Sequence, residues 1–82
     1  MATVTIYSKK DCHLCDIAKA DLETLRCDFD FSLNEVDIEK DRLAFEKYKY
    51  LIPVIEVDGR IISTYKVDPD KMKALLRKKK FM

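Results

Sequence analysis

The chain has 82 residues, 48% of them hydrophobic and 38% charged, and its sixteen basic and fifteen acidic side chains give a net charge of +1. This length allows one domain, placed over residues 1–82, with a modest core and room for one site. The balanced charge argues against nucleic-acid binding, and no apolar run is long enough for a membrane span. Because three cysteines are an odd number and no signal-peptide pattern is present, we expect a cytoplasmic protein. We also expect a monomer.

The first predicted elements are a strand and a helix with two cysteines at their junction. Residues 3–7 form a short β-favouring run, and residues 8–10 form a polar turn. A helical pattern follows and should end near residues 26–28. Asp11 is predicted to be the N-cap, because its carboxylate can accept hydrogen bonds from the unpaired amides of the first turn. Cys12 and Cys15 therefore lie in that turn.

This position determines the chemistry expected of the two thiols. The free N–H groups and peptide dipoles of a helix N-terminus lower the pKa of the Cys12 thiol, so Cys12 is expected to be an exposed nucleophile. Cys15 lies on the inward stripe of the helix and should act second, by attacking a mixed disulfide at Cys12. His13 has two roles that stay open: a cation that stabilises the thiolate, or an exposed polar residue without a part in the chemistry.

The cysteine pair also allows two alternatives to redox chemistry. A metal-binding or metal-delivering domain would use Cys12 and Cys15 as ligands, but no second Cys-x-x-Cys accompanies them. Cys27 lies about 18 Å further along the same helix at about 1.5 Å per residue, so we interpret it as a bystander thiol. The second alternative is a non-catalytic interaction module. The strand-then-helix setting favours redox chemistry, with no bound metal.

The middle of the chain predicts a second strand and a second helix. Apolar and polar residues alternate over 29–33, and Val36 and Ile38 continue the alternation on the opposite phase, through a bulge or a strand end. Strand, helix and strand in this order predict a parallel pair. Residues 39–48 fit a short helix, capped by Asp37 or a nearby residue. The packing stripe of this helix consists of Leu43, Ala44, Phe45 and Tyr48.

Asp58-Gly59 lies between two β-branched runs and is the strongest hairpin signal in the chain. It predicts a two-residue type I′ turn. Pro53 opens the first strand of the hairpin, a position that tolerates a residue without an N–H. The local sequence does not predict a cis bond at Ile52-Pro53, because the cis form is the minority state.

A final helix begins at Asp68-Pro69, where Asp68 can cap and Pro69 suits the first helical position. Arg77-Lys78-Lys79-Lys80 lies in its last turn. We interpret this basic run as a solvated helix end that complements the helix dipole, in preference to an RNA or membrane patch.

The order of these elements, with Cys12-His13-Leu14-Cys15 in the first helix and Ile52-Pro53-Val54 about forty residues later, resembles the thioredoxin superfamily. In length and layout the chain is most similar to the glutaredoxin-like proteins, particularly a small group with Cys-His-Leu-Cys. The resemblance covers nearly all of the chain. It implies an α/β, thioredoxin-like fold of order βαβαββα, in which a central four-stranded mixed sheet is flanked by three helices.

The resemblance also implies a function. Cys12 would be the nucleophile and Cys15 the resolving thiol of a thiol-disulfide oxidoreductase that reduces protein or low-molecular-weight disulfides. Pro53 would be a cis-proline beside them, and Ile52 would pair its backbone with a bound peptide or thiol substrate. Glutathione or a thioredoxin reductase would donate the electrons, with no bound cofactor. The residues assigned to substrate binding are Lys10, His13, Leu14, Ile52, Pro53 and Asp68.

One region departs from the glutaredoxin pattern. Glutaredoxins have a Gly-Gly and an acidic residue after the last strand, which help to hold the γ-glutamyl end of glutathione. The matching region here, residues 63–68, has no glycine. By resemblance, Lys9 or Lys10 would meet a glutathione carboxylate and Asp68 its amine.

Overall fold

The computed structural model describes residues 2–80, with side chains up to residue 77. Within that range no helix is both long enough and apolar enough to cross a bilayer. The predicted order of elements is confirmed, with one added 3₁₀ turn, η1. In chain order the elements are β1 (Ala2–Ser8), α1 (His13–Arg26), β2 (Phe31–Asp37), η1 (Ile38–Lys40), α2 (Arg42–Tyr48), β3 (Val54–Val57), β4 (Arg60–Thr64) and α3 (Pro69–Lys80).

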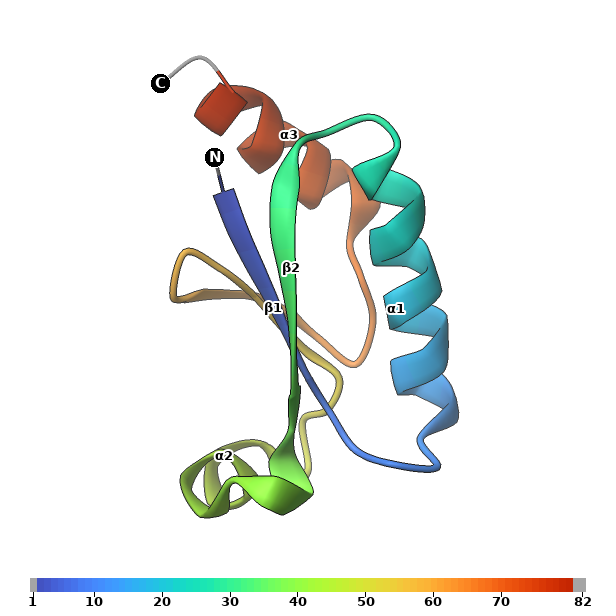
Figure 1. Ribbon diagram of the computed structural model, residues 1–82, viewed down its shortest axis with the longest axis vertical. Coiled ribbons are helices and arrows are strands. Elements are labelled where there is room, and N and C mark those ends of the chain that lie inside the picture. Colours follow the sequence, from blue (N-terminus) through green and yellow to red (C-terminus); the bar gives the residue numbers. More distant parts are fainter. Residues whose placement is uncertain (1, 81–82) are drawn as a thin grey trace.

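The four strands form one mixed sheet in the order β2-β1-β3-β4. β1 and β2 are parallel, as the predicted βαβ unit requires, and the two remaining pairs are antiparallel. Helices α1 and α3 cover one face of the sheet, and α2 lies on the opposite side near one end (Figure 1). This arrangement confirms the predicted thioredoxin-like architecture.

Two apolar clusters hold these layers together. In the larger cluster, Val4 and Ile6 of β1 pack with Leu22 of α1 and Met72 of α3, and all four are fully buried. The smaller cluster lies at the end of the sheet where α1 begins and α2 packs. Its buried members are Cys15, Ile38, Ala44, Tyr48, Ile52 and Val54. The cysteine pair is therefore attached to a core of its own.

The predicted hairpin and the predicted cap of the last helix are both confirmed. Asp58 and Gly59 both have positive φ, 50° and 85°, as a type I′ turn requires. A carboxylate oxygen of Asp68 accepts a hydrogen bond from the Lys71 amide at 3.1 Å, at the start of α3. Both features could be predicted because the turn and the capping hydrogen bond each involve only residues close together in the sequence.

The predicted second helix is interrupted. Asp37 caps η1 by accepting from the Glu39 amide at 2.9 Å, and Asp41 caps α2 by accepting from the Ala44 amide at 3.2 Å. Because α2 has only two turns, one i, i+4 pair, Ala44 and Tyr48, covers its buried side. The prediction that Leu43 and Phe45 belong to the packing stripe is wrong, since both side chains are exposed.

The basic run at the end of α3 lies outside the described side chains apart from Arg77, which is exposed.

Candidate active site

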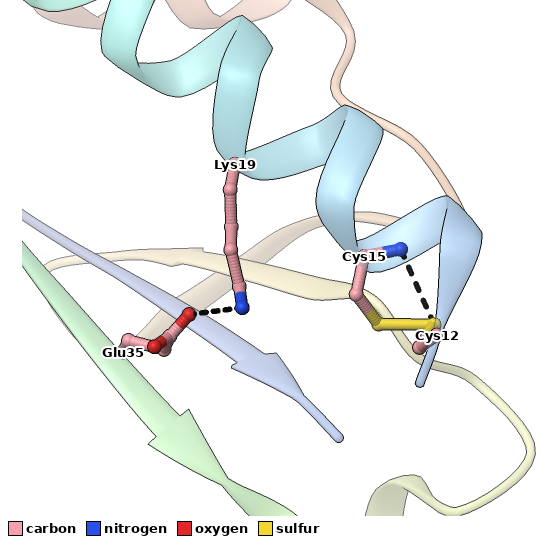
Figure 2. The surroundings of a disulfide bond; sticks show 4 residues. All are labelled: Cys12, Cys15, Lys19 and Glu35. Atoms are coloured by element: carbon pink, nitrogen blue, oxygen red, sulfur yellow. Dashed lines mark hydrogen bonds and ion pairs between the residues drawn. A yellow bond between two sulfur atoms is a disulfide. The ribbon is translucent and has the colours of Figure 1, made fainter. Parts of the chain in front are cut away.

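The cysteine pair lies at the N-terminus of α1, immediately after the turn that follows β1. Cys12 and Cys15 are joined as a disulfide, and their Cα atoms are 5.2 Å apart (Figure 2). Cys15 is completely buried, whereas Cys12 is only partly buried. The expectation that Cys15 faces inward is confirmed. Cys12 is more accessible than Cys15 but is not exposed as expected, because it packs against the smaller cluster.

The prediction that Asp11 caps α1 is wrong. Asp11 has a φ of 60°, a left-handed conformation that aspartate tolerates better than most residues, and the chain turns there. The N-cap is Cys12, whose sulfur accepts a hydrogen bond from the Cys15 amide at 3.2 Å. The Cys12 sulfur thus occupies the capping position itself, where the helix N-terminus favours negative charge.

The proline loop lies against the same cluster. The Ile52–Pro53 peptide bond is cis, as the family resemblance implies and the local sequence does not predict. Ile52 is buried in the apolar cluster that contains Cys15, and Cys12 packs against that cluster. Pro53 is fully buried. The structure therefore brings together the two cysteines and the loop containing Ile52 and Pro53.

The remaining predicted site residues divide into two groups. Lys10, His13 and Leu14 are exposed around Cys12, in the turn before α1 and in its first turn. Asp68 instead caps α3. The residues on either side of it line a surface pocket together with Asp21, which lies nine residues beyond Cys12 on α1. Because Thr24 and Leu25 also line this pocket, Asp68 lies beside the C-terminal half of α1, away from its cysteine end.

Tyr65, which follows β4, holds the proline loop through two hydrogen bonds, a role that the sequence does not reveal. Its amide donates to the Pro53 carbonyl at 2.8 Å, and its hydroxyl donates to the Tyr50 carbonyl at 3.0 Å. Its φ is 69°, a conformation that glycine adopts readily and tyrosine rarely. Tyr65 lies in the region where glutaredoxins carry Gly-Gly, so here a tyrosine takes the left-handed position and fastens the loop through its hydroxyl.

Two tyrosines and a glutamate cover the far side of the smaller cluster. The rings of Tyr7 and Tyr48 pack with centroids 4.7 Å apart, and the Tyr48 hydroxyl donates to the Glu56 carboxylate at 3.4 Å. Burial raises the pKa of Tyr7 to about 12, and a hydrogen bond to Glu56 and the negative charge of that carboxylate act in the same direction. Tyr7 is therefore a neutral neighbour of the site throughout the range in which thiols ionise.

The raised pKa of Tyr7 predicts a loss of stability in alkaline solution. The ordinary tyrosine pKa is 10.0 and the folded value is about 12, so the folded state retains a proton that the unfolded chain releases. The contribution of Tyr7 is complete below about pH 10 and is lost as the pH rises toward 12. Between about pH 10 and 12, we expect the unfolding free energy of Tyr7→Phe to decrease less with pH than that of the unsubstituted protein. Denaturant titration of the oxidised form at several pH values measures both slopes. Equal slopes would contradict the assignment.

A disulfide at the N-terminus of the first helix of a βαβ unit, with a buried cis-proline loop packed against it, defines a thioredoxin-fold protein with a dithiol or disulfide pair. Solved structures agree with this fold. Protein Ne2328 from Nitrosomonas europaea is similar with a TM-score of 0.82 and 25% identity, over 92% of this chain and 91% of that one. A mutant thioredoxin from Halobacterium salinarum is similar in fold, with a TM-score of 0.65 and 20% identity, over 94% and 73% of the two chains.

The sequence comparisons identify the family. The Glutaredoxin-like domain (DUF836) matches residues 3–77. A "Glutaredoxin-like protein YDR286C homolog" from Dictyostelium discoideum is 31% identical in an alignment 79 residues long, and the match covers 84% of this chain and 69% of that protein. The chain belongs to the glutaredoxin-like family, as its sequence motifs indicate.

Proposed function

We propose that the protein is a thiol-disulfide oxidoreductase that reduces disulfides of proteins or low-molecular-weight thiols. The observation that carries the proposal is the cysteine pair itself: a partly buried Cys12 sulfur at the N-cap of α1, bonded to a fully buried Cys15 sulfur one turn deeper. One sulfur is accessible to a substrate, and the other is placed to react only with the first. A redox role is also what the glutaredoxin-like family and the thioredoxin-like fold support.

The reaction has two exchange steps. The Cys12 thiolate attacks one sulfur of the substrate disulfide, forms a mixed disulfide with it and releases the other sulfur as a thiolate. Cys15 then loses its proton and attacks the Cys12 sulfur, which expels the second substrate thiolate and leaves Cys12 and Cys15 joined. Two electrons have passed from the protein to the substrate. The position of Cys12 at the helix N-terminus favours both its attack and its departure as a thiolate from the mixed disulfide during regeneration.

The proline loop is the proposed substrate-binding element. Ile52 packs in the cluster beneath the cysteine pair, so a substrate strand paired with the Ile52 backbone would pass beside Cys12. Lys10, His13 and Leu14 are exposed and close to Cys12 in the sequence, and they would form the rest of the contact surface. Asp68 caps α3, so in this proposal its charge contributes to substrate binding only when the substrate extends along α1.

The proposal is tested by insulin reduction with dithiothreitol as the electron source. We expect the protein to accelerate precipitation of the insulin chains, and the same protein alkylated in its reduced form to give only the uncatalysed rate. Equal rates of insulin precipitation with the unmodified and the alkylated protein would contradict the oxidoreductase proposal and support a non-catalytic interaction module. Metal bound stoichiometrically to protein purified without chelators would instead support a metal-binding domain.

Glutathione or a thioredoxin reductase is the proposed electron donor. The oxidised protein is offered glutathione in one reaction and NADPH with thioredoxin reductase in another, and free thiols are counted over time. Reduction by either donor assigns it, and reduction by neither contradicts both proposals.

A further inference from the structure

An ion pair lies one helical turn behind the buried cysteine. Lys19 is four residues beyond Cys15 on α1, and its ammonium group pairs with the carboxylate of Glu35 on β2 (Figure 2). The unbroken register of β1 with β2 places Glu35 on the same face as Phe31 and Leu33, which is the apolar phase of the strand. A carboxylate therefore occupies a position where the alternation calls for an apolar residue.

The same register accounts for the change of phase in β2. It shows neither a bulge nor a strand end before Asp37, so Val36 simply lies on the opposite face of the sheet. The interruption of the apolar pattern is Glu35 itself. The Glu35 carboxylate forms an ion pair with Lys19 between β2 and α1. Both side chains are partly exposed, 51% for Glu35 and 35% for Lys19.

The second step of the proposed reaction would be favoured by a positive charge near Cys15. Cys15 must become a thiolate although its side chain is completely buried, and burial disfavours the charged form. Side chains four residues apart on a helix have Cβ atoms about 5–6 Å apart. Figure 2 shows the Cys15 and Lys19 side chains extending from the same side of α1 toward the sheet.

The other groups around Cys15 do not supply a positive charge on its inward side. Tyr48 of α2 belongs to the same buried cluster as Cys15, and Tyr7 of β1, whose pKa is raised to about 12, packs against that cluster. The other packed elements contribute carboxylates: Glu56 on β3 accepts from the Tyr48 hydroxyl, Asp37 at the end of β2 caps η1, and the charge of Asp41 acts on Tyr7. The remaining neighbours in the cluster, Ile38, Ile52 and Val54, are apolar. On α1 itself, His13 and Asp16 are exposed, and Cys12 is the redox partner. The described side chains thus leave Lys19 as the cation on this flank.

We propose that the Lys19–Glu35 ion pair controls how readily the resolving cysteine ionises: the ammonium group stabilises the Cys15 thiolate, and the carboxylate limits that effect. Lys19 and Glu35 are positioning residues in this proposal, which rests on the function proposed above. The ionisation itself involves no change of oxidation state, because the Cys15 thiol only releases its proton to water. The resulting thiolate then attacks the Cys12 sulfur, forms the Cys12–Cys15 disulfide and expels the substrate thiolate, which takes up the electron pair.

The proposal predicts opposite effects from the two halves of one ion pair. Lys19→Met leaves the carboxylate alone near Cys15 and should move the midpoint of thiolate formation up by about one pH unit, a tenfold loss of thiolate. Glu35→Gln leaves the ammonium alone and should move the midpoint down. Each substitution breaks the same ion pair, so a merely structural role would move both midpoints in one direction.

The measurement uses protein in which Cys15 is the sole thiol, made by Cys12→Ser and Cys27→Ser, and follows the ultraviolet absorbance of the thiolate as the pH is raised. Serine at position 12 retains an N-cap, so α1 is preserved. Lys19→Arg retains the charge and should keep the original midpoint. The Arg26–Glu23 pair at the far end of α1 is the matched control, and Arg26→Met and Glu23→Gln should have no effect.

Midpoint shifts of the same sign, or no shift in either variant, would overturn the proposal. Shifts equal to those of the Arg26 and Glu23 controls would also overturn it, because they would reflect net charge alone. This titration needs no turnover. A protein that fails to reduce insulin therefore contradicts the proposed function, whereas a failed titration contradicts only the role of the ion pair.

Discussion

Replacing Cys15 with Ser should leave Cys12 permanently joined to the first disulfide that it attacks. The variant retains the accessible sulfur at the N-cap of α1 but lacks the buried thiol that releases the substrate. We expect turnover of a protein disulfide to fall at least about a hundredfold, to the rate at which external thiols resolve the intermediate. A covalent adduct with substrate, seen as a band on non-reducing gels and lost on reduction, accompanies that fall.

Two further cysteine variants make this result specific. Cys12→Ser should abolish turnover and form no adduct, because the attacking sulfur is gone. Cys27→Ser should be as active as the unsubstituted protein, since Cys27 is exposed at the C-terminal end of α1. An adduct in Cys12→Ser would reverse the assigned order of attack, whereas full activity in Cys15→Ser would contradict the role of Cys15 as the resolving thiol.

Replacing Leu22 with Ala is expected to cost about 2–5 kcal/mol of unfolding free energy. Leu22 is completely buried between α1, the sheet and α3, where its loss removes apolar contacts and leaves a cavity. The total stability of a domain is only about 5–15 kcal/mol, so this one substitution removes a large part of it. Urea unfolding followed by circular dichroism measures the change.

Leu14→Ala is the matched control for this measurement. It makes the same chemical change on the same helix, but the Leu14 side chain is 50% exposed, and we expect a change within about 0.5 kcal/mol. Equal losses for the two variants would show that helix propensity, and not burial in the larger cluster, accounts for the effect. A loss of stability in Leu22→Ala alone would confirm that Leu22 is a core residue and Leu14 a surface residue near Cys12.

The sequence predicted those features whose causes are local. The turn at Asp58-Gly59 and the cap at Asp68 each involve residues within a few positions, and both were confirmed. The inward position of Cys15 followed from the apolar stripe of α1. The cap of α1 was predicted one residue too early because both Asp11 and Cys12 have acceptor side chains, and backbone conformation decided between them.

The features that the sequence did not reveal depend on contacts between distant segments. Glu35 looks like a break in a strand until the register with β1 shows that it faces Lys19. Tyr65 fastens the proline loop through bonds to residues more than ten positions away, and its left-handed conformation has no local signature. The cis bond at Pro53 was accessible only through the family resemblance.

The disulfide closes between residues three positions apart, within a single turn of α1. A ring this small restricts the unfolded chain little, by at most about 2 kcal/mol in the chain-entropy relation. Because the ring also lies within one turn of α1, we expect the backbone change on reduction to be confined to that turn. A macromolecule that distinguishes the oxidised from the reduced form would then have to contact the start of α1.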